Sequence, residues 1–261
     1  MTKLHIACLC GVCLYVTGKA QEGFHLGVAG AFNSTWILNQ NNYGTLAPFT
    51  NYLVRSSEMD YRFTWGGQAG IALGYNFTRN WGIQAEILYN FTGQRYEDNF
   101  EGPAIIPQGT FGSAQQYVNV KRNISLQYLQ IPVMARFISS GSNTVRFTAA
   151  LGPQVGFRTR AREEVYIAGY PYDTLALPPK EKFRPVDFGL ALQAGAEIYA
   201  TDNLYLDVGL NVYGGLTDIN GQVLRTLGWY SQNDVKYQKS YNFRIGLMAG
   251  IHYLFGRGRE Y

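Results

Sequence analysis

The chain has 261 residues, of which 46% are apolar, 15% are aromatic and only 15% are charged, with 30 glycines and 20 tyrosines. Soluble chains usually carry about a quarter charged residues, and the net charge of +4 comes without a basic stripe that would indicate a nucleic-acid partner. The mean hydropathy is −0.15, and no run of about 18 apolar residues follows the N-terminal stretch. The composition therefore excludes a helical membrane protein, a coiled coil and an acidic disordered chain, and it favours a β-rich protein of one domain or at most two.

Residues 1–20 have the parts of a secretory signal peptide. Lys3 is basic, residues 4–16 are mostly apolar, and small residues stand at positions −3 and −1 before Gln21. All three cysteines of the chain lie in this stretch. We therefore expect a cleaved leader and a mature domain over residues 21–261 without a thiol, which excludes cysteine catalysis, zinc–thiolate sites and disulfides.

The mature chain holds eight segments in which apolar residues alternate with polar residues or glycine, the pattern of a β-strand with unlike faces. In the second segment, for example, Trp65, Ile71 and Tyr75 alternate with Gly66 and Gly74. Each segment is as long as the roughly 9–11 residues that a tilted strand needs to cross a bilayer. In chain order the segments are 24–32, 65–77, 81–91, 129–137, 145–157, 186–198, 204–212 and 241–255.

The connections between these segments alternate between short and long. The short turns are residues 78–80, 139–143 and 200–203. The long loops are at about 34–62, 93–122, 159–185 and 215–240. Short periplasmic turns and longer outer loops are typical of an outer-membrane barrel, whereas a soluble β-sandwich gives no reason for the alternation. The sequence thus predicts an all-β fold, a single, monomeric eight-stranded antiparallel transmembrane β-barrel with four extracellular loops, three periplasmic turns and both termini periplasmic.

Several stretches resemble the PorT-like family of small outer-membrane β-barrels common in Bacteroidetes. The stretches that carry the resemblance are 128–137 (YLQIPVMARF), 81–89 (WGIQAEILY), 151–153 (LGP), 187–190 (DFGL) and 213–219 (YGGLTDI). The resemblance implies an integral barrel of the bacterial outer membrane. One branch of the family takes part in type IX secretion and gliding, so an accessory role in that machinery is one alternative function that the resemblance implies.

By strand parity, eight charged side chains face the interior of the barrel. They are Glu86, Arg136, Arg146, Arg158, Asp187, Glu197, Asp207 and Arg244. An eight-stranded barrel is just wide enough to be filled by side chains, and a buried charge without a partner is costly. We therefore expect a paired charge network that fills the lumen, with a gate or a narrow small-solute channel as the alternative. A bulge near Pro132 or Pro153 would shift the parity.

The mature chain has two histidines, His25 and His252, near the periplasmic ends of the first and last strands. Closure of the barrel makes these strands neighbours, so the two rings can meet inside it, either as lumen packing or as a metal or proton site. No histidine lies in the outer loops, which excludes a catalytic triad at the outer rim. The sequence therefore predicts no enzymatic activity, no cofactor and no bound metal.

The outer loops are rich in Asn, Gln, Tyr, Ser and Gly with nearly balanced charge, a composition that suits adaptable recognition of a protein or a glycan. One loop contains Asp173-Thr174-Leu175, which resembles the O-glycosylation sequon of Bacteroidetes and makes Thr174 a candidate attachment site. We expect a non-enzymatic outer-membrane barrel with a structural or surface-interaction role. Its expected partners are outer-membrane lipid, a surface protein or glycan, and other envelope proteins, but not nucleic acid.

Overall fold

The computed structural model describes residues 23–39, 59–101, 117–140, 144–167, 179–225 and 237–255. Its strands are β1 (Gly23–Leu38), β2 (Asp60–Arg62), β3 (Trp65–Asn76), β4 (Trp81–Glu101), β5 (Tyr117–Ile138), β6 (Val145–Ile167), β7 (Val186–Tyr199), β8 (Leu204–Gly215) and β9 (Tyr241–Phe255). Two short helices are α4 (Pro179–Lys182) and α5 (Gln222–Arg225). Within these described ranges, no helix has the length and apolar character needed to cross a bilayer.

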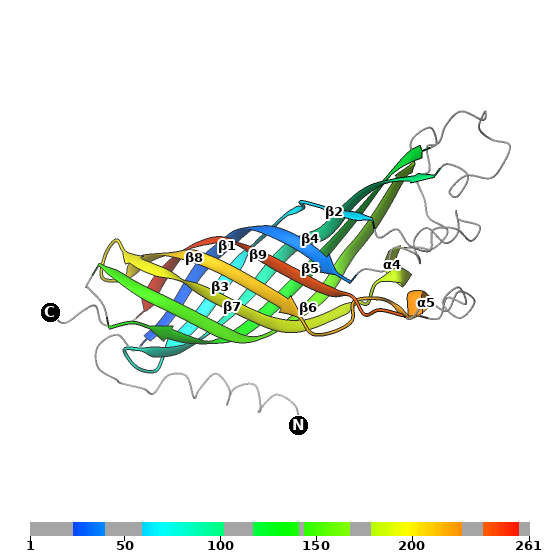
Figure 1. The fold of residues 1–261 in the computed structure, drawn as a ribbon. Helices are drawn as coiled ribbons and strands as arrows, with labels where there is room; N and C mark the ends of the chain where they lie inside the picture. Colours follow the sequence, from blue (N-terminus) through cyan, green and yellow to red (C-terminus); the bar gives the residue numbers. More distant parts are fainter. Residues whose placement is uncertain are drawn as a thin grey trace, which may run out of the picture.

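Every strand except the short β2 is hydrogen-bonded to a strand on each side, so the sheet closes into a ring. β1 pairs with β9, with Phe24 opposite Phe255, and the ring is completed where β4 pairs with β5, with Trp81 opposite Phe137. All pairings are antiparallel. Figure 1 shows the strands tilted around the barrel, with the tight turns gathered at one end. The predicted eight-stranded antiparallel barrel is confirmed.

Successive side chains of each strand point alternately out of the barrel and into it. Along β7, for example, Phe188, Leu190 and Leu192 are exposed, whereas Asp187 and Gln193 are buried. The exposed faces are therefore apolar and the buried faces polar, the inverse of a soluble protein. An apolar surface repeated on every long strand is a lipid-facing surface.

Aromatic side chains mark both edges of this lipid-facing surface. Near the short turns, the rings of Trp81 and Phe137 pack at 5.2 Å between centroids. Near the other end, Trp65 packs against Phe32 at 4.5 Å and against Phe63 at 4.2 Å. Aromatic rings are enriched where a barrel meets the two membrane interfaces, so these clusters place the membrane boundaries.

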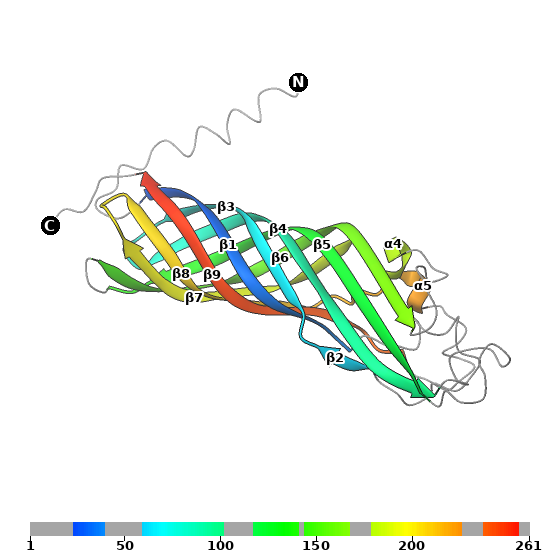
Figure 2. The ribbon, with the colours of Figure 1, turned by 90° about the horizontal axis from the view of Figure 1, so that it is seen from above.

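Three strands continue past the outer aromatic edge as a twisted ribbon of β4, β5 and β6, to which β2 is added along the edge of β4 (Figures 1 and 2). The expected loops at 93–122 and 159–185 are wrong for residues 93–101, 117–122 and 159–167, which are strand. β4 continues to Glu101, β5 begins at Tyr117 and β6 continues to Ile167. The outward side chains of the ribbon are polar, so the apolar period that marks the membrane segments is missing there.

A register shift lies between Gln127 and Tyr128, where β5 meets β6. The bulge is at neither Pro132 nor Pro153, since these prolines are paired in register with Gln154 and Leu190 respectively. Thr159 is the extra residue, because Tyr128 pairs with Arg158 and Gln127 with Arg160. The bulge changes the parity of the outer part of β6, so Glu163 and Val165 face inward.

The predicted leader, residues 1–20, and the candidate glycosylation site Thr174 lie outside the described residues. Residues 40–58, 102–116, 168–178 and 226–236, which belong to the four expected loops, also fall outside them. What the structure describes is the barrel, the ribbon and the bases of two loops.

Candidate functional site

The layer of the lumen nearest the short turns is an ion-paired cluster on β5, β7 and β8. Glu197 and Asp207 are directly opposite each other on neighbouring strands, an arrangement in which like charges repel. Arg136 reaches them from β5, donating to the Glu197 carboxylate and lying 3.8 Å from Oδ2 of Asp207. All three side chains are buried, so one guanidinium stabilises two carboxylates that the register forces together.

The two histidines lie beside this cluster. The rings of His25 and His252 are 5.6 Å apart, and His252 stacks on Tyr205 at 4.9 Å. The Tyr205 hydroxyl is 3.0 Å from Nδ1 of His25, and Nη1 of Arg136 is 3.3 Å from its Nε2. Both ring nitrogens of His25 are thus engaged by lumen side chains. Within the described part of the chain, no group of three or more His, Cys, Asp or Glu side chains is arranged to hold a metal ion.

In the middle of the lumen, charged side chains are hydrogen-bonded to neutral ones. Oε1 of Glu86 accepts hydrogen bonds from Gln84 at 2.6 Å and Gln193 at 3.0 Å. Arg244 donates to Oε1 of Gln154 at 3.0 Å. The expected pairing of four acidic with four basic groups is therefore replaced here by amide partners, because glutamines on the inward face lie closer than the opposite charges.

The upper layer is centred on Asp187. Its carboxylate accepts hydrogen bonds from the hydroxyls of Tyr213 at 2.9 Å and Thr217 at 3.0 Å, and from the amide of Asn242 at 2.8 Å. Three donors satisfy a buried carboxylate without an ion pair. The ring of Tyr213 also lies under the guanidinium of Arg244, 4.6 Å from its centroid.

Arg146 and Arg158, the other two residues of the expected network, lie at its ends. Arg146 on β6 is over the ring of Tyr199, 5.3 Å from the centroid. Arg158 is at the outer mouth of the lumen and donates to the backbone carbonyls of Phe183 and Lys180, the latter at 2.9 Å. Arg158 therefore fastens the loop before β7 rather than pairing with a carboxylate inside the barrel.

The lumen is filled by these side chains. Gln84, Gln130, Arg136 and Gln154 are each 1% exposed and Arg244 is 2% exposed, although they lie on four different strands. The lining of a water-filled channel would remain accessible to water. The geometry is that of a polar core packed inside a barrel.

The segments that carry α4 and α5 lie at the outer end of the barrel (Figures 1 and 2), where the first of them contacts the inward-facing side chains of Arg158 and Glu163. The two segments pair through a bridge between Phe183 and Asn220 and through a hydrogen bond of 2.6 Å from the Gly221 amide to the Lys182 carbonyl. Phe183 and Asn220 are buried. We call residues 179–185 and 218–225 the lid.

The lid is held to the ribbon by a buried carboxylate on β6. Glu163 accepts hydrogen bonds from Arg122 at 2.6 Å and from Lys182 of α4 at 2.8 Å. Burial opposes ionisation of this carboxyl, but the two cations outweigh it and hold the pKa of Glu163 below its ordinary value. The position follows from the bulge at Thr159, because without it Glu163 would face outward.

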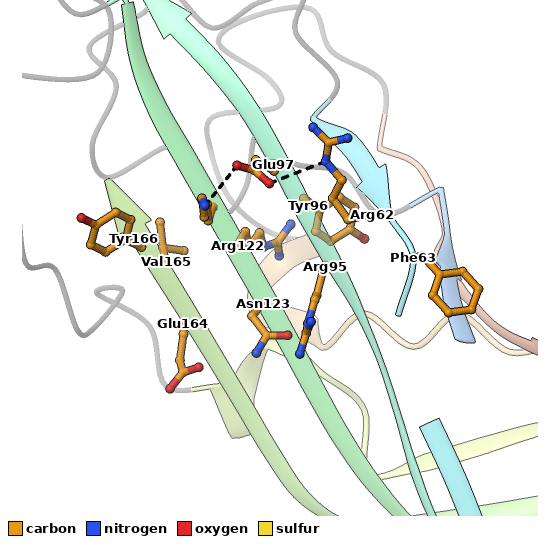
Figure 3. Close-up of a pocket in the computed structure, with 11 residues that line it drawn as sticks. Arg62, Phe63, Arg95, Tyr96, Glu97, Arg122, Asn123, Glu164, Val165 and Tyr166 are labelled. Carbon is orange, nitrogen blue, oxygen red and sulfur yellow. Dashed lines mark ion pairs between the residues drawn. The ribbon is translucent and has the colours of Figure 1, made fainter. Parts of the chain in front are cut away.

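Two hollows lined by residues that the structure describes lie at this outer end. The first is a groove of about 780 Å³ on the ribbon, with side chains from β2, β4, β5 and β6 around it (Figure 3). It is lined by Arg62, Phe63, Arg95, Tyr96, Glu97, Lys121, Arg122, Asn123, Glu164, Val165 and Tyr166. Glu97 lies between two cations, 3.2 Å from Nζ of Lys121 and 3.7 Å from Nε of Arg62. Lys121 is the main cause that lowers the pKa of the Glu97 carboxyl.

The second hollow, of about 550 Å³, is on the lid. It is lined by Lys180, Glu181, Phe183, Arg184, Pro185, Gly221, Gln222 and Arg225. Its charged lining consists of three cations and one carboxylate. Arg225 is also fixed by Asp218, 2.9 Å away.

Neither hollow is predicted from the sequence, because the residues that line them are expected to lie in loops. One signal was available for the ribbon. Val120, Ile124 and Leu126 alternate with polar residues, and the structure buries all three on the inward face. Below them Leu129 faces lipid, so the apolar phase inverts at the membrane boundary. A strand expected from apolar residues at every second position in one unbroken alternation therefore ends at the membrane boundary.

A family model described as the outer membrane protein beta-barrel domain matches residues 19–221. The chain belongs to this family. Membership of this family identifies the protein as an integral β-barrel of the outer membrane. No curated protein matches the chain.

Solved barrels resemble the chain only distantly. The Neisserial surface protein A is 13% identical with a TM-score of 0.38, over 89% of this chain and 97% of the other. OprG from Pseudomonas aeruginosa is 10% identical with a TM-score of 0.37, over 90% and 98%. Ail of Yersinia pestis is 10% identical with a TM-score of 0.30, over 88% and 99%. The fold assignment rests on the closed ring of strands and on the family match.

Proposed function

We propose that the protein is a non-enzymatic, non-conducting outer-membrane barrel that recognises a cell-surface partner through its lid and outer loops. The observation that carries the proposal is the contrast between the two ends of the interior. The lumen is filled with buried side chains, whereas the lid at its outer end carries a hollow of about 550 Å³.

The charge of the lid hollow supports an anionic partner, a protein or a glycan. Lys180, Arg184 and Arg225 surround it and Glu181 is its one carboxylate within the described lining. Guanidinium groups bind carboxylates and sulfates in a bidentate geometry. We expect barrels carrying Arg184→Glu to lose binding to sulfated or uronic-acid glycans on an array, whereas Arg79→Glu, in an exposed periplasmic turn, retains it. Equal glycan binding by both variants would show that the lid hollow is not the binding site.

The channel alternative is tested by conductance. A filled lumen predicts no porin-like steps in a planar bilayer, for the unmodified barrel and for Glu86→Gln alike. Steps that change when Glu86 or Arg136 is neutralised would establish a channel instead.

The resemblance to PorT-like barrels supports the second alternative, an accessory role in type IX secretion. A deletion strain scored for cargo trapped in the periplasm separates the two functions. Normal secretion supports the surface-recognition function, and trapped cargo replaces it with the secretion role.

Export to the outer membrane requires a leader, and we propose that residues 1–20 are removed. N-terminal sequencing of the barrel recovered from membranes is expected to begin at Gln21. A mature chain that begins at Met1 would contradict the proposal.

A further inference from the structure

We propose that the outward face of the β2–β4–β5–β6 ribbon binds the phosphate groups of glycolipids in the outer leaflet of the membrane. The face carries five basic side chains, which we call the basic shelf. They are Arg62, Arg95, Lys121, Arg160 and Arg162. The proposal concerns the side of the ribbon that adjoins lipid, not the lid, and it does not depend on the surface-recognition function.

The basic shelf begins where the lipid-facing surface ends. On β4, Tyr89 and Phe91 are exposed among the lipid-facing side chains, and the Tyr89 hydroxyl donates to Oε1 of Gln127 at 2.9 Å. A tyrosine with its ring towards lipid and its hydroxyl on a polar partner is typical of the membrane interface. The next residue on the outward face beyond Gly93 is Arg95, so the basic shelf stands at the level of the lipid headgroups.

The register concentrates positive charge on this face. Arg62 and Arg95 are directly opposite each other on β2 and β4, where like charges destabilise the pairing. Arg160 and Arg162 follow each other on the outward face of β6, with Gln127 and Ser125 as their β5 partners. An anion bound between these cations relieves the repulsion.

The outward face carries three carboxylates among the side chains that the structure describes, Asp60, Glu97 and Glu164, against the five cations of the basic shelf. Glu97 is shared by Arg62 and Lys121, and Glu164 is 2.5 Å from Arg162. Among the residues that the structure describes, no carboxylate oxygen lies within 4 Å of Arg95 or Arg160.

The shape and surroundings of the basic shelf favour a lipid headgroup as the occupant. The groove of about 780 Å³ is lined by three of the five basic-shelf side chains, Arg62, Arg95 and Lys121, and Figure 3 shows it along β2, β4, β5 and β6. Phe63 forms part of its lining and packs on Trp65 of the outer aromatic edge. The groove is thus continuous with the surface that contacts acyl chains. A glycolipid places its phosphates on the guanidinium groups while its chains lie against the apolar wall.

The test uses the full-length barrel in nanodiscs of phosphatidylcholine that contain either bisphosphorylated lipid A or its dephosphorylated form. Lipid that remains bound to the barrel after extraction in mild detergent is counted by native mass spectrometry. We expect the phosphorylated lipid to be retained preferentially, and Arg62→Gln/Arg95→Gln to lower its retention about tenfold, as the loss of charge-assisted hydrogen bonds implies.

Arg79→Gln, which removes an exposed arginine at the periplasmic end, is the matched control and is expected to retain the lipid. Folding of each variant is checked by its heat-modifiable mobility on a gel. Equal retention of the two lipids, equal retention by the double variant and the control, or displacement by an equal concentration of inorganic phosphate would each overturn the proposal.

Discussion

Arg122 donates a hydrogen bond of 2.6 Å to Glu163 across the β5–β6 pair, and neither side chain is exposed to solvent. Glu163 also accepts a hydrogen bond from Lys182 of the lid. One carboxylate therefore joins the ribbon to the lid and stabilises two buried cations. Together with the hydrogen bonds from Arg158 to the carbonyls of Phe183 and Lys180, this contact fastens the lid to the ribbon.

Glu163→Gln is expected to loosen the lid. The substitution keeps the shape of the side chain but removes the negative charge that both cations share. Breaking a buried ion pair in this way costs about 3–5 kcal/mol. The loss is measured as a lower urea midpoint, followed by tryptophan fluorescence, and as faster trypsin cleavage at Lys180 and Lys182.

Glu164→Gln is the matched control on the same strand. Glu164 faces outward and pairs with Arg162, and both side chains are well exposed. Exposed pairs contribute about 0–1 kcal/mol, so this variant is expected to behave like the unmodified barrel. A control as unstable as Glu163→Gln would show that β6, rather than the buried contact, is sensitive to substitution.

The attachment of the lid is also expected to depend on pH. The pKa of Glu163 is lower in the folded protein than its ordinary value of 4.5, so the folded state favours the ionised form. The stabilisation is therefore complete above pH 4.5 and is lost as the pH falls through the lowered pKa. Pepsin digestion across this range is expected to show the lid becoming accessible only below pH 4.5, and Glu163→Gln to abolish the dependence. An unchanged profile in the variant would assign the transition to other carboxyls.

The stability of the barrel is expected to be sensitive to side-chain volume added beside the two histidines. Gly74 is opposite His25, and a Cβ at position 74 would overlap the His25 ring. Gly74→Ala is therefore expected to destabilise the barrel by about 1–3 kcal/mol, the usual effect of overpacking. Gly67→Ala on the same strand is the control, since its Cβ would meet only ordinary van der Waals contact. Heat-modifiable mobility over a temperature series compares them, and equal stability would mean that the ring moves aside.

Much of the fold followed from the sequence because lipid imposes a simple rule. Side chains such as Leu190 and Ile251 face lipid while their neighbours face the lumen, so the period-two pattern identified the membrane strands and the turn lengths gave their order. Parity alone also brought Arg136, Glu197 and Asp207 onto the inward face. The amide partners of Glu86 were not predictable, because parity gives the face of a residue but not its height in the lumen.

The outer end was predicted poorly for a physical reason. Above the membrane, solvent replaces lipid, so the outward face becomes polar and apolar residues such as Ile124 turn inward. The pattern changes phase within one continuous strand, and the bulge at Thr159 shifts β6 again. The inward position of Glu163 and the outward position of the basic shelf result from these two changes. Amino-acid composition indicates neither change.

The ion-paired layer of the lumen nearest the short turns is expected to depend on Arg136. Arg136→Met leaves Glu197 and Asp207 opposite each other inside the barrel without the guanidinium that contacts both. Removing one member of a buried ion pair costs about 3–5 kcal/mol, so the variant is expected to lose its folded gel mobility at a lower temperature. Arg79→Met, in the exposed periplasmic turn, is expected to match the unmodified barrel.

A double variant separates electrostatics from packing. Adding Glu197→Gln to Arg136→Met removes one of the two opposed carboxylates, so it is expected to recover part of the lost stability. The coupling free energy from the complete cycle is expected to be favourable by roughly 0.5–3 kcal/mol, the range for residues in one ion-pair network. If the two substitutions are additive, Arg136 stabilises the barrel by filling space, and the opposed carboxylates are stabilised by their other neighbours.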